Sequence, residues 1–141
     1  MDGIEIKNNR IDKSIPIYII HPNNAKWVFF SGLFEEYGHA FYSSESNIIF
    51  LDGRLEDEEW FTDDHLYVIE AHELAHKLAG HTHGHDIQSE KEADFLGYNI
   101  LKQMGLVSAS QLHKEEFKNR YKISVEEFDV PELIERIISE L

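Results

Sequence analysis

The hydrophobic pattern of this chain of 141 residues changes from strand-like to helix-like near residue 60. Before that point, short apolar runs rich in β-branched and aromatic residues are separated by turn residues, which predicts strands over residues 15–20 and 26–30. Residues 38–42 and 47–51 flank a polar four-residue segment, which predicts a β-hairpin. Strands followed by helices favour an α+β fold with a small N-terminal sheet that contains antiparallel pairs.

After residue 60, apolar residues recur every three or four positions, as in amphipathic helices. Thr62 can cap the first helix, and Gly80 is expected to end it. Ser89 and Glu92 have the spacing of a capping box at the start of a second helix. Three helices are therefore expected beyond the first, over about 86 or 89 to 104, about 109 to 121, and from Pro131 to near residue 140.

Composition limits the partners of the chain. It carries a formal net charge of −14, so it is repelled by nucleic-acid phosphates, and no nucleic-acid partner is expected. The N-terminus lacks the features of a signal peptide, and no apolar run approaches the length of a membrane span. We therefore expect one domain over residues 1–141, in the cytoplasm, with no membrane partner. The chain has no cysteine, so a bound metal must use His, Asp, Glu or water.

The first predicted helix carries the motif His72-Glu73-Leu74-Ala75-His76. Residues four apart lie on one face of a helix, so both imidazoles can bind one zinc ion. Glu73 is placed to reach a water on that ion. Zinc lowers the pKa of its water to about 7, and a carboxylate can take the proton as the water attacks a carbonyl. The motif predicts a Zn²⁺-dependent peptide hydrolase in which Glu73 is catalytic.

A catalytic zinc ion usually has a third protein ligand, and the sequence offers two sources for it. Glu90 on the second predicted helix could complete a His-His-Glu site, and Asp94, four residues later, could accept a hydrogen bond from a ligand imidazole. The alternative is a His-His-His site that uses a residue from the cluster His81, His83 and His85.

The segment from about Tyr67 to Gly105, a quarter of the chain, resembles the gluzincin metallopeptidases. Its nearest likeness is to the prenyl-protein and heat-shock membrane proteases, which carry a Glu-x-x-Ala-Asp pattern after the zinc helix. The resemblance implies a minimal zincin-like domain with Glu90 as the third ligand and Asp94 supporting a ligand imidazole. It leaves Glu92 as a helix cap or a solvent-facing residue.

The chain departs from those proteases because it has no membrane-spanning helices and because the segment between His76 and Glu90 is short. In both respects it resembles the small peptidase domains of phage and bacterial regulators that cleave repressors. A rival resemblance is to Spartan-like proteases of DNA–protein crosslinks, which use a third His. The metzincin pattern is missed, because this chain has Ala79 and Thr82 where that pattern needs Gly and His.

The expected activity is therefore that of a zinc endopeptidase with a peptide or protein substrate. The transition state also needs a donor for its oxyanion, and Tyr98, four residues after Asp94, is the candidate, with His113 and Tyr121 as others. A zinc-binding regulatory module without catalysis and a Spartan-like protease remain the alternatives. The sequence does not indicate the substrate or the oligomeric state.

Overall fold

The computed structural model describes residues 2–81 and 86–141. The predicted α+β fold is confirmed, with a mixed sheet in the N-terminal part and helices after it. By its internal contacts the chain forms two units, Met1–Thr62 and Asp63–Leu141. The expectation of one domain over residues 1–141 stays a prediction, and each unit is described by itself. None of the helices in the described part of the chain is long and apolar enough to span a membrane.

The first unit is built on a four-stranded sheet with the order β1-β2-β4-β3. The predicted hairpin is confirmed as the antiparallel pair β3–β4, and β2 pairs parallel to β4. Ile17 and Ile19 of β2 lie opposite Ile49 and Leu51 of β4, and all four are buried. The strands are β1 (Ile4–Lys7), β2 (Ile17–Ile20), β3 (Ala40–Ser43) and β4 (Ile48–Asp52), of which β1 was not predicted.

The strand predicted over residues 26–30 is wrong, because this segment begins the helix α1 (Trp27–Tyr37). The aromatic residues Trp27, Phe30 and Phe34 recur with helical spacing, and the Phe34 ring lies 6.1 Å from Trp27 and 6.5 Å from Phe30. Phe30 also packs on Phe50 of β4, with 5.4 Å between ring centroids. Val28 and its neighbour Phe29 are 85% and 63% exposed, so the side chains do not alternate as in a strand. The aromatic run therefore forms one helix face.

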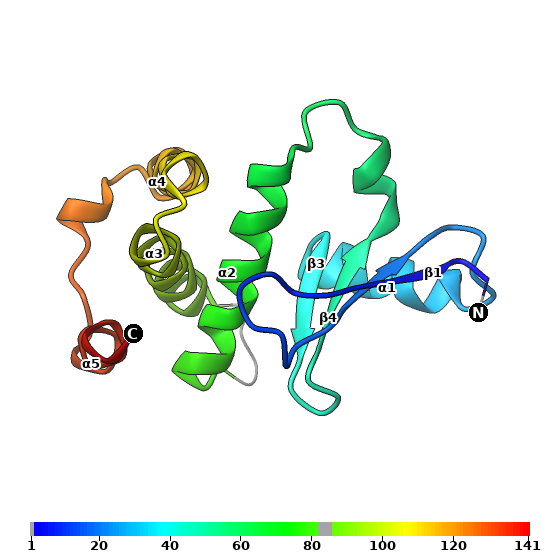
Figure 1. The fold of residues 1–141 in the computed structure, drawn as a ribbon, viewed down its shortest axis with the longest axis horizontal. Coiled ribbons are helices and arrows are strands. Elements are labelled where there is room, and N and C mark those ends of the chain that lie inside the picture. The colour runs from blue at the N-terminus through cyan, green and yellow to red at the C-terminus, as the bar shows by residue number, and fades with distance from the viewer. Residues whose placement is uncertain (1, 82–85) are drawn as a thin grey trace. The chain divides into compact units, whose positions relative to one another are not determined.

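In the second unit, the described residues form the expected first helix and the three further helices (Figure 1). The α3 helix contacts α2, α4 and α5. Asp86, and not Ser89, caps α3, because its carboxylate accepts a hydrogen bond from the Ser89 backbone at 2.7 Å. The helices are α2 (Asp63–Ala79), α3 (Ile87–Gln103), α4 (Val107–Tyr121) and α5 (Glu132–Glu140), with the short 3-10 helix η2 (Val125–Glu127). Another 3-10 helix, η1 (Gly53–Asp57), belongs to the first unit.

Candidate metal centre

Three side chains from α2 and α3 bring their polar atoms to one point. Nε2 of His72 lies 3.0 Å from Nε2 of His76. Oε2 of Glu90 lies 3.1 Å from the first of these nitrogens, and Oε1 of the same carboxylate lies 3.2 Å from the second. The four-residue spacing on α2 accounts for the His pair, and the packing of α3 on α2 brings in Glu90.

The two nitrogens and the Glu90 carboxylate fit a zinc ion. Zinc binds imidazole nitrogen at about 2.0–2.1 Å and carboxylate oxygen at about 2.0–2.2 Å, so tetrahedral ligands lie about 3.3 Å apart. The observed separations of 3.0–3.2 Å require shifts of only a few tenths of an ångström. Two neutral imidazoles and one carboxylate are also a donor set that zinc accepts in catalytic sites.

Glu73 lies beside the same two imidazoles. One ring nitrogen of His72, one of His76 and a carboxylate oxygen of Glu73 all lie within 4.8 Å of one another. The Glu73 side chain is buried within α2. A buried carboxylate at this distance from the ligand nitrogens can reach a water that shares their metal ion.

Asp94 holds the other side of the His72 ring. Its Oδ1 lies 2.6 Å from Nδ1 of His72 and 3.2 Å from Nε2 of His113. Its Oδ2 accepts hydrogen bonds from Arg120 at 2.9 Å and from the Tyr121 hydroxyl at 2.5 Å. Because Nδ1 of His72 donates to this carboxylate, the lone pair of Nε2 is left for a metal.

Gly97, one turn after Asp94, permits this close approach. A Cβ at Gly97 would lie 2.6 Å from Cε1 of His113 and 3.2 Å from the backbone nitrogen of His72. Only a residue without a side chain lets α2 and the His113 ring come this near to α3. The packing around Asp94 therefore requires a glycine at position 97.

The charges of the cluster support one another. Burial opposes ionisation of Asp94, but His72 and His113 outweigh it and hold the pKa of Asp94 well below its usual range. Burial also opposes ionisation of Glu90, but hydrogen bonds from His72 and His76 lower its pKa. Asp94 and Glu90 raise the pKa of His72 well above its ordinary value despite burial, whereas burial lowers the pKa of His76. Both carboxylates are thus ionised at neutral pH, as ligation and ligand support require.

The residues of the alternative His cluster have different positions. Nδ1 of His81 lies 3.0 Å from Nδ1 of His76, on the side of that ring opposite to Glu90. His83 and His85 lie outside the described residues. The expectation that Glu92 is a helix cap or faces solvent is wrong. Its carboxylate lies 3.1 Å from Nε2 of His81, and its side chain is only 17% exposed.

The oxyanion candidates lie in two environments. Nε2 of His113 and the hydroxyl of Tyr121 contact Asp94. The Tyr98 ring packs against the hydrophobic cluster of Phe117, Val125 and Phe128. A role for Tyr98 as an oxyanion donor stays a prediction. Sequence reasoning missed Arg120, although His113, Arg120 and Tyr121 have the spacing of one helix face on α4.

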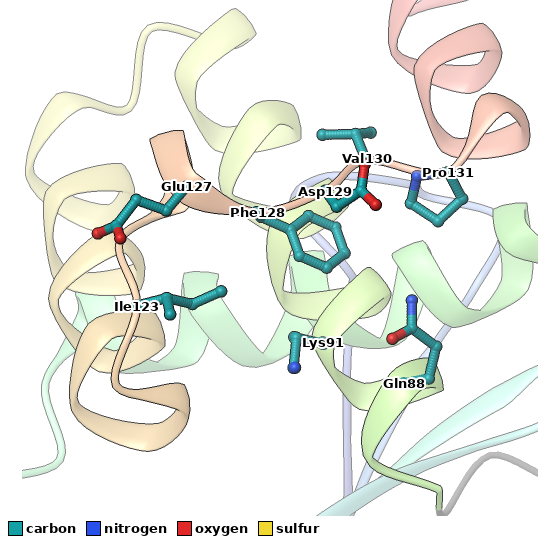
Figure 2. A pocket seen from close by; sticks show the side chains of 8 residues that line it. All are labelled: Gln88, Lys91, Ile123, Glu127, Phe128, Asp129, Val130 and Pro131. Carbon is teal, nitrogen blue, oxygen red and sulfur yellow. The ribbon is translucent and has the colours of Figure 1, made fainter.

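A cavity of about 390 Å³ opens beside α3 (Figure 2). Gln88 and Lys91 of α3 form one wall, and Phe128 to Pro131, which lead from η2 to α5, form the other. The amide of Gln88 also donates a hydrogen bond to Glu92 at 3.0 Å. The cavity wall is thus linked by Glu92 and His81 to the His76 ring.

Comparison of the chain with protein-family models, curated proteins and solved structures finds no match. The functional argument therefore rests on the geometry of the site and on the residues that form it.

Proposed function

We propose that this chain is a zinc-dependent endopeptidase of the gluzincin type, with His72, His76 and Glu90 as zinc ligands and Glu73 as the general base. One observation carries the proposal. Two imidazole nitrogens and a carboxylate converge within 3.0–3.2 Å of one another, and the buried Glu73 lies beside them. A metal site with an adjacent base is one of the arrangements that can hydrolyse an unreactive amide.

Each group has a chemical task in this reaction. Zinc, when bound, lowers the pKa of a coordinated water to about 7 and polarises the substrate carbonyl. Glu73 takes a proton from the attacking water and delivers it to the leaving amide nitrogen. Asp94 keeps the proton of His72 on Nδ1 and the ring in place. Water and one peptide bond thus give a carboxylic acid and an amine.

Glu90 is the better third ligand because of the contacts that it makes. Its carboxylate lies within 3.2 Å of both ligand nitrogens. His81 instead contacts the opposite nitrogen of the His76 ring. His83 and His85 lie outside the described residues and remain alternatives to Glu90 as the third ligand. The zinc content of Glu90→Ala, His83→Ala and His85→Ala distinguishes them. Loss of zinc in a His variant but not in Glu90→Ala would overturn the assignment.

The decisive experiment replaces the base and keeps the ligands. Wild type should bind one zinc ion per chain and cleave a denatured protein or a peptide library. Glu73→Gln should bind zinc equally well, and its cleavage rate should fall by about 10²–10⁴-fold because the proton acceptor is gone. Glu115→Gln, on the exposed side of α4, makes the same change of charge away from the site and should cleave like wild type.

Cleavage by Glu73→Gln at the wild-type rate would overturn the mechanism. A wild-type protein that holds zinc but cleaves nothing in the library would instead indicate a zinc-binding regulatory module. Salt-dependent binding of DNA would favour the Spartan-like alternative, against the net charge of −14.

A further inference from the structure

The end of α2 places His81 against the ligand His76. The Gly80 amide donates to the carbonyl of Lys77 at 3.2 Å, and the His81 amide donates to the carbonyl of His76 at 3.0 Å. Gly80 has a φ of +73°. These are the two hydrogen bonds and the left-handed residue of a Schellman motif. The motif turns the chain back, so that the His81 side chain lies beside the last turn of the helix.

If His76 binds a metal, the ring protons of His76 and His81 can be placed in only one consistent way. Nε2 of His76 must offer its lone pair to the metal, so its Nδ1 carries the proton. That nitrogen lies 3.0 Å from Nδ1 of His81, which must accept the hydrogen bond. The proton of His81 is therefore on Nε2, which lies 3.1 Å from Oε1 of Glu92 and donates to it.

Glu92 is well placed to serve as the acceptor that ends this chain. Its second oxygen accepts a hydrogen bond from Gln88 at 3.0 Å. The side chains of His81 and Glu92 are 11% and 17% exposed, so water competes little for these contacts. An ionised carboxylate also stabilises the positive charge that a metal ion induces on the imidazoles. Glu92 thus supports His76 through the His81 ring, whereas Asp94 supports His72 by a direct hydrogen bond.

We propose that His81 and Glu92 are positioning residues for the metal centre, which hold His76 with Nε2 facing the ion. The inference rests on the proposed function, because it concerns the same zinc site. It also explains why His81 is not the third ligand. An imidazole that accepts a hydrogen bond at Nδ1 and donates one from Nε2 has no lone pair left for a metal.

The test measures zinc affinity by competition with a chromophoric chelator, and the visible spectrum of the cobalt-substituted protein. Glu92→Ala and His81→Ala should weaken zinc binding by about 10–100-fold, as loss of such partners does elsewhere. Glu92→Gln keeps an oxygen for His81 and loses only the charge, so its affinity should lie between those of wild type and Glu92→Ala. The cobalt spectrum should shift in His81→Ala, because the His76 ring loses its restraint. Glu115→Gln is the control of equal charge.

Each outcome separates this inference from the proposed function. Wild-type affinity and an unchanged cobalt spectrum in both Glu92→Ala and His81→Ala would overturn the positioning role and leave the zinc site intact. Complete loss of zinc in His81→Ala, with Glu92→Gln and Glu92→Ala unchanged, would make His81 a ligand and also overturn it. A wild-type protein without measurable zinc affinity would overturn the proposed function itself.

Discussion

Each unit contains a buried aspartate bonded to a histidine and an arginine, and the two clusters differ in what lies beyond the histidine. In the first unit, Asp52 lies 3.0 Å from Nδ1 of His39 and accepts hydrogen bonds from the Arg54 backbone and guanidinium. In the second, Asp94 contacts His72, His113, Arg120 and Tyr121. Burial opposes the charge of both aspartates, and their partners nevertheless lower the pKa of each.

The two clusters differ in the exposure of the histidine and in the groups that its ring contacts. Asp52 bonds Arg54, two residues on, and His39, whose backbone carbonyl also accepts from the Asp52 amide at 2.8 Å. The His39 side chain is 64% exposed. His72 is 15% exposed, and its other nitrogen lies 3.0 Å from Nε2 of His76. A buried aspartate bonded to a histidine and an arginine therefore does not by itself indicate a metal centre, whereas the convergence of further ligand atoms on the imidazole does.

The largest effect is expected from Asp94→Asn. This change removes the charge that His72 and His113 face and leaves their buried donors poorly paired, which costs about 3–5 kcal/mol of unfolding free energy for a buried pair. Zinc affinity should fall by about 10–100-fold, because His72 loses its acceptor. Denaturant unfolding and chelator competition measure the two effects. Retention of wild-type zinc affinity by the folded variant would remove the distinction between the Asp94 and Asp52 clusters.

A smaller effect on stability is expected from Gly97→Ala. The new Cβ would lie 2.6 Å from Cε1 of His113 and 3.2 Å from the His72 nitrogen, so the helices must move apart. Such overpacking costs about 1–3 kcal/mol, and zinc affinity should fall as the His72 backbone shifts. Gly32→Ala on α1 is the matched control, because its Cβ would meet nothing within 4 Å. It should stabilise the protein by about 0.5–1 kcal/mol. Equal effects of the two changes would contradict this account of Gly97.

The sequence predicted the elements whose signals are local. The helical His72–His76 spacing, the Gly80 stop and the β3–β4 hairpin follow from residues near one another in the chain. The α1 segment was mistaken for a strand because its first four residues are all apolar, and only the later Phe34 reveals the helical period. Short apolar runs are ambiguous in this way.

The residues that support the proposed ligands were harder to predict from the sequence. Asp94 could be predicted as a support of a ligand imidazole because it lies four residues from Glu90. Arg120 and Tyr121 reach Asp94 from another helix, 26 and 27 residues later, so only tertiary packing joins them. The His81–Glu92 pair depends on the turn at Gly80 and on the direction of two side chains, which spacing does not specify.

The smallest effect is expected from Asp52→Asn, and it tests the structural role of the first cluster. The pKa of Asp52 is lowered in the folded protein, so its ionised form stabilises the fold above the unfolded-state pKa of about 3.9. That contribution is lost as the pH falls below this value and through the lower folded-state pKa. Near pH 7 the variant should lose about 1–2 kcal/mol of unfolding free energy, because the Arg54 side chain is 51% exposed and can turn to solvent.

The difference between wild type and Asp52→Asn should therefore shrink as unfolding is measured from pH 6 down to pH 3. The subtraction isolates Asp52, because both proteins keep the acid-sensitive Glu90 and Asp94. Zinc affinity at pH 7 should equal that of wild type, since all the proposed ligands lie in the second unit. A loss of zinc affinity as large as that of Asp94→Asn would show that the Asp52 cluster also supports the metal centre.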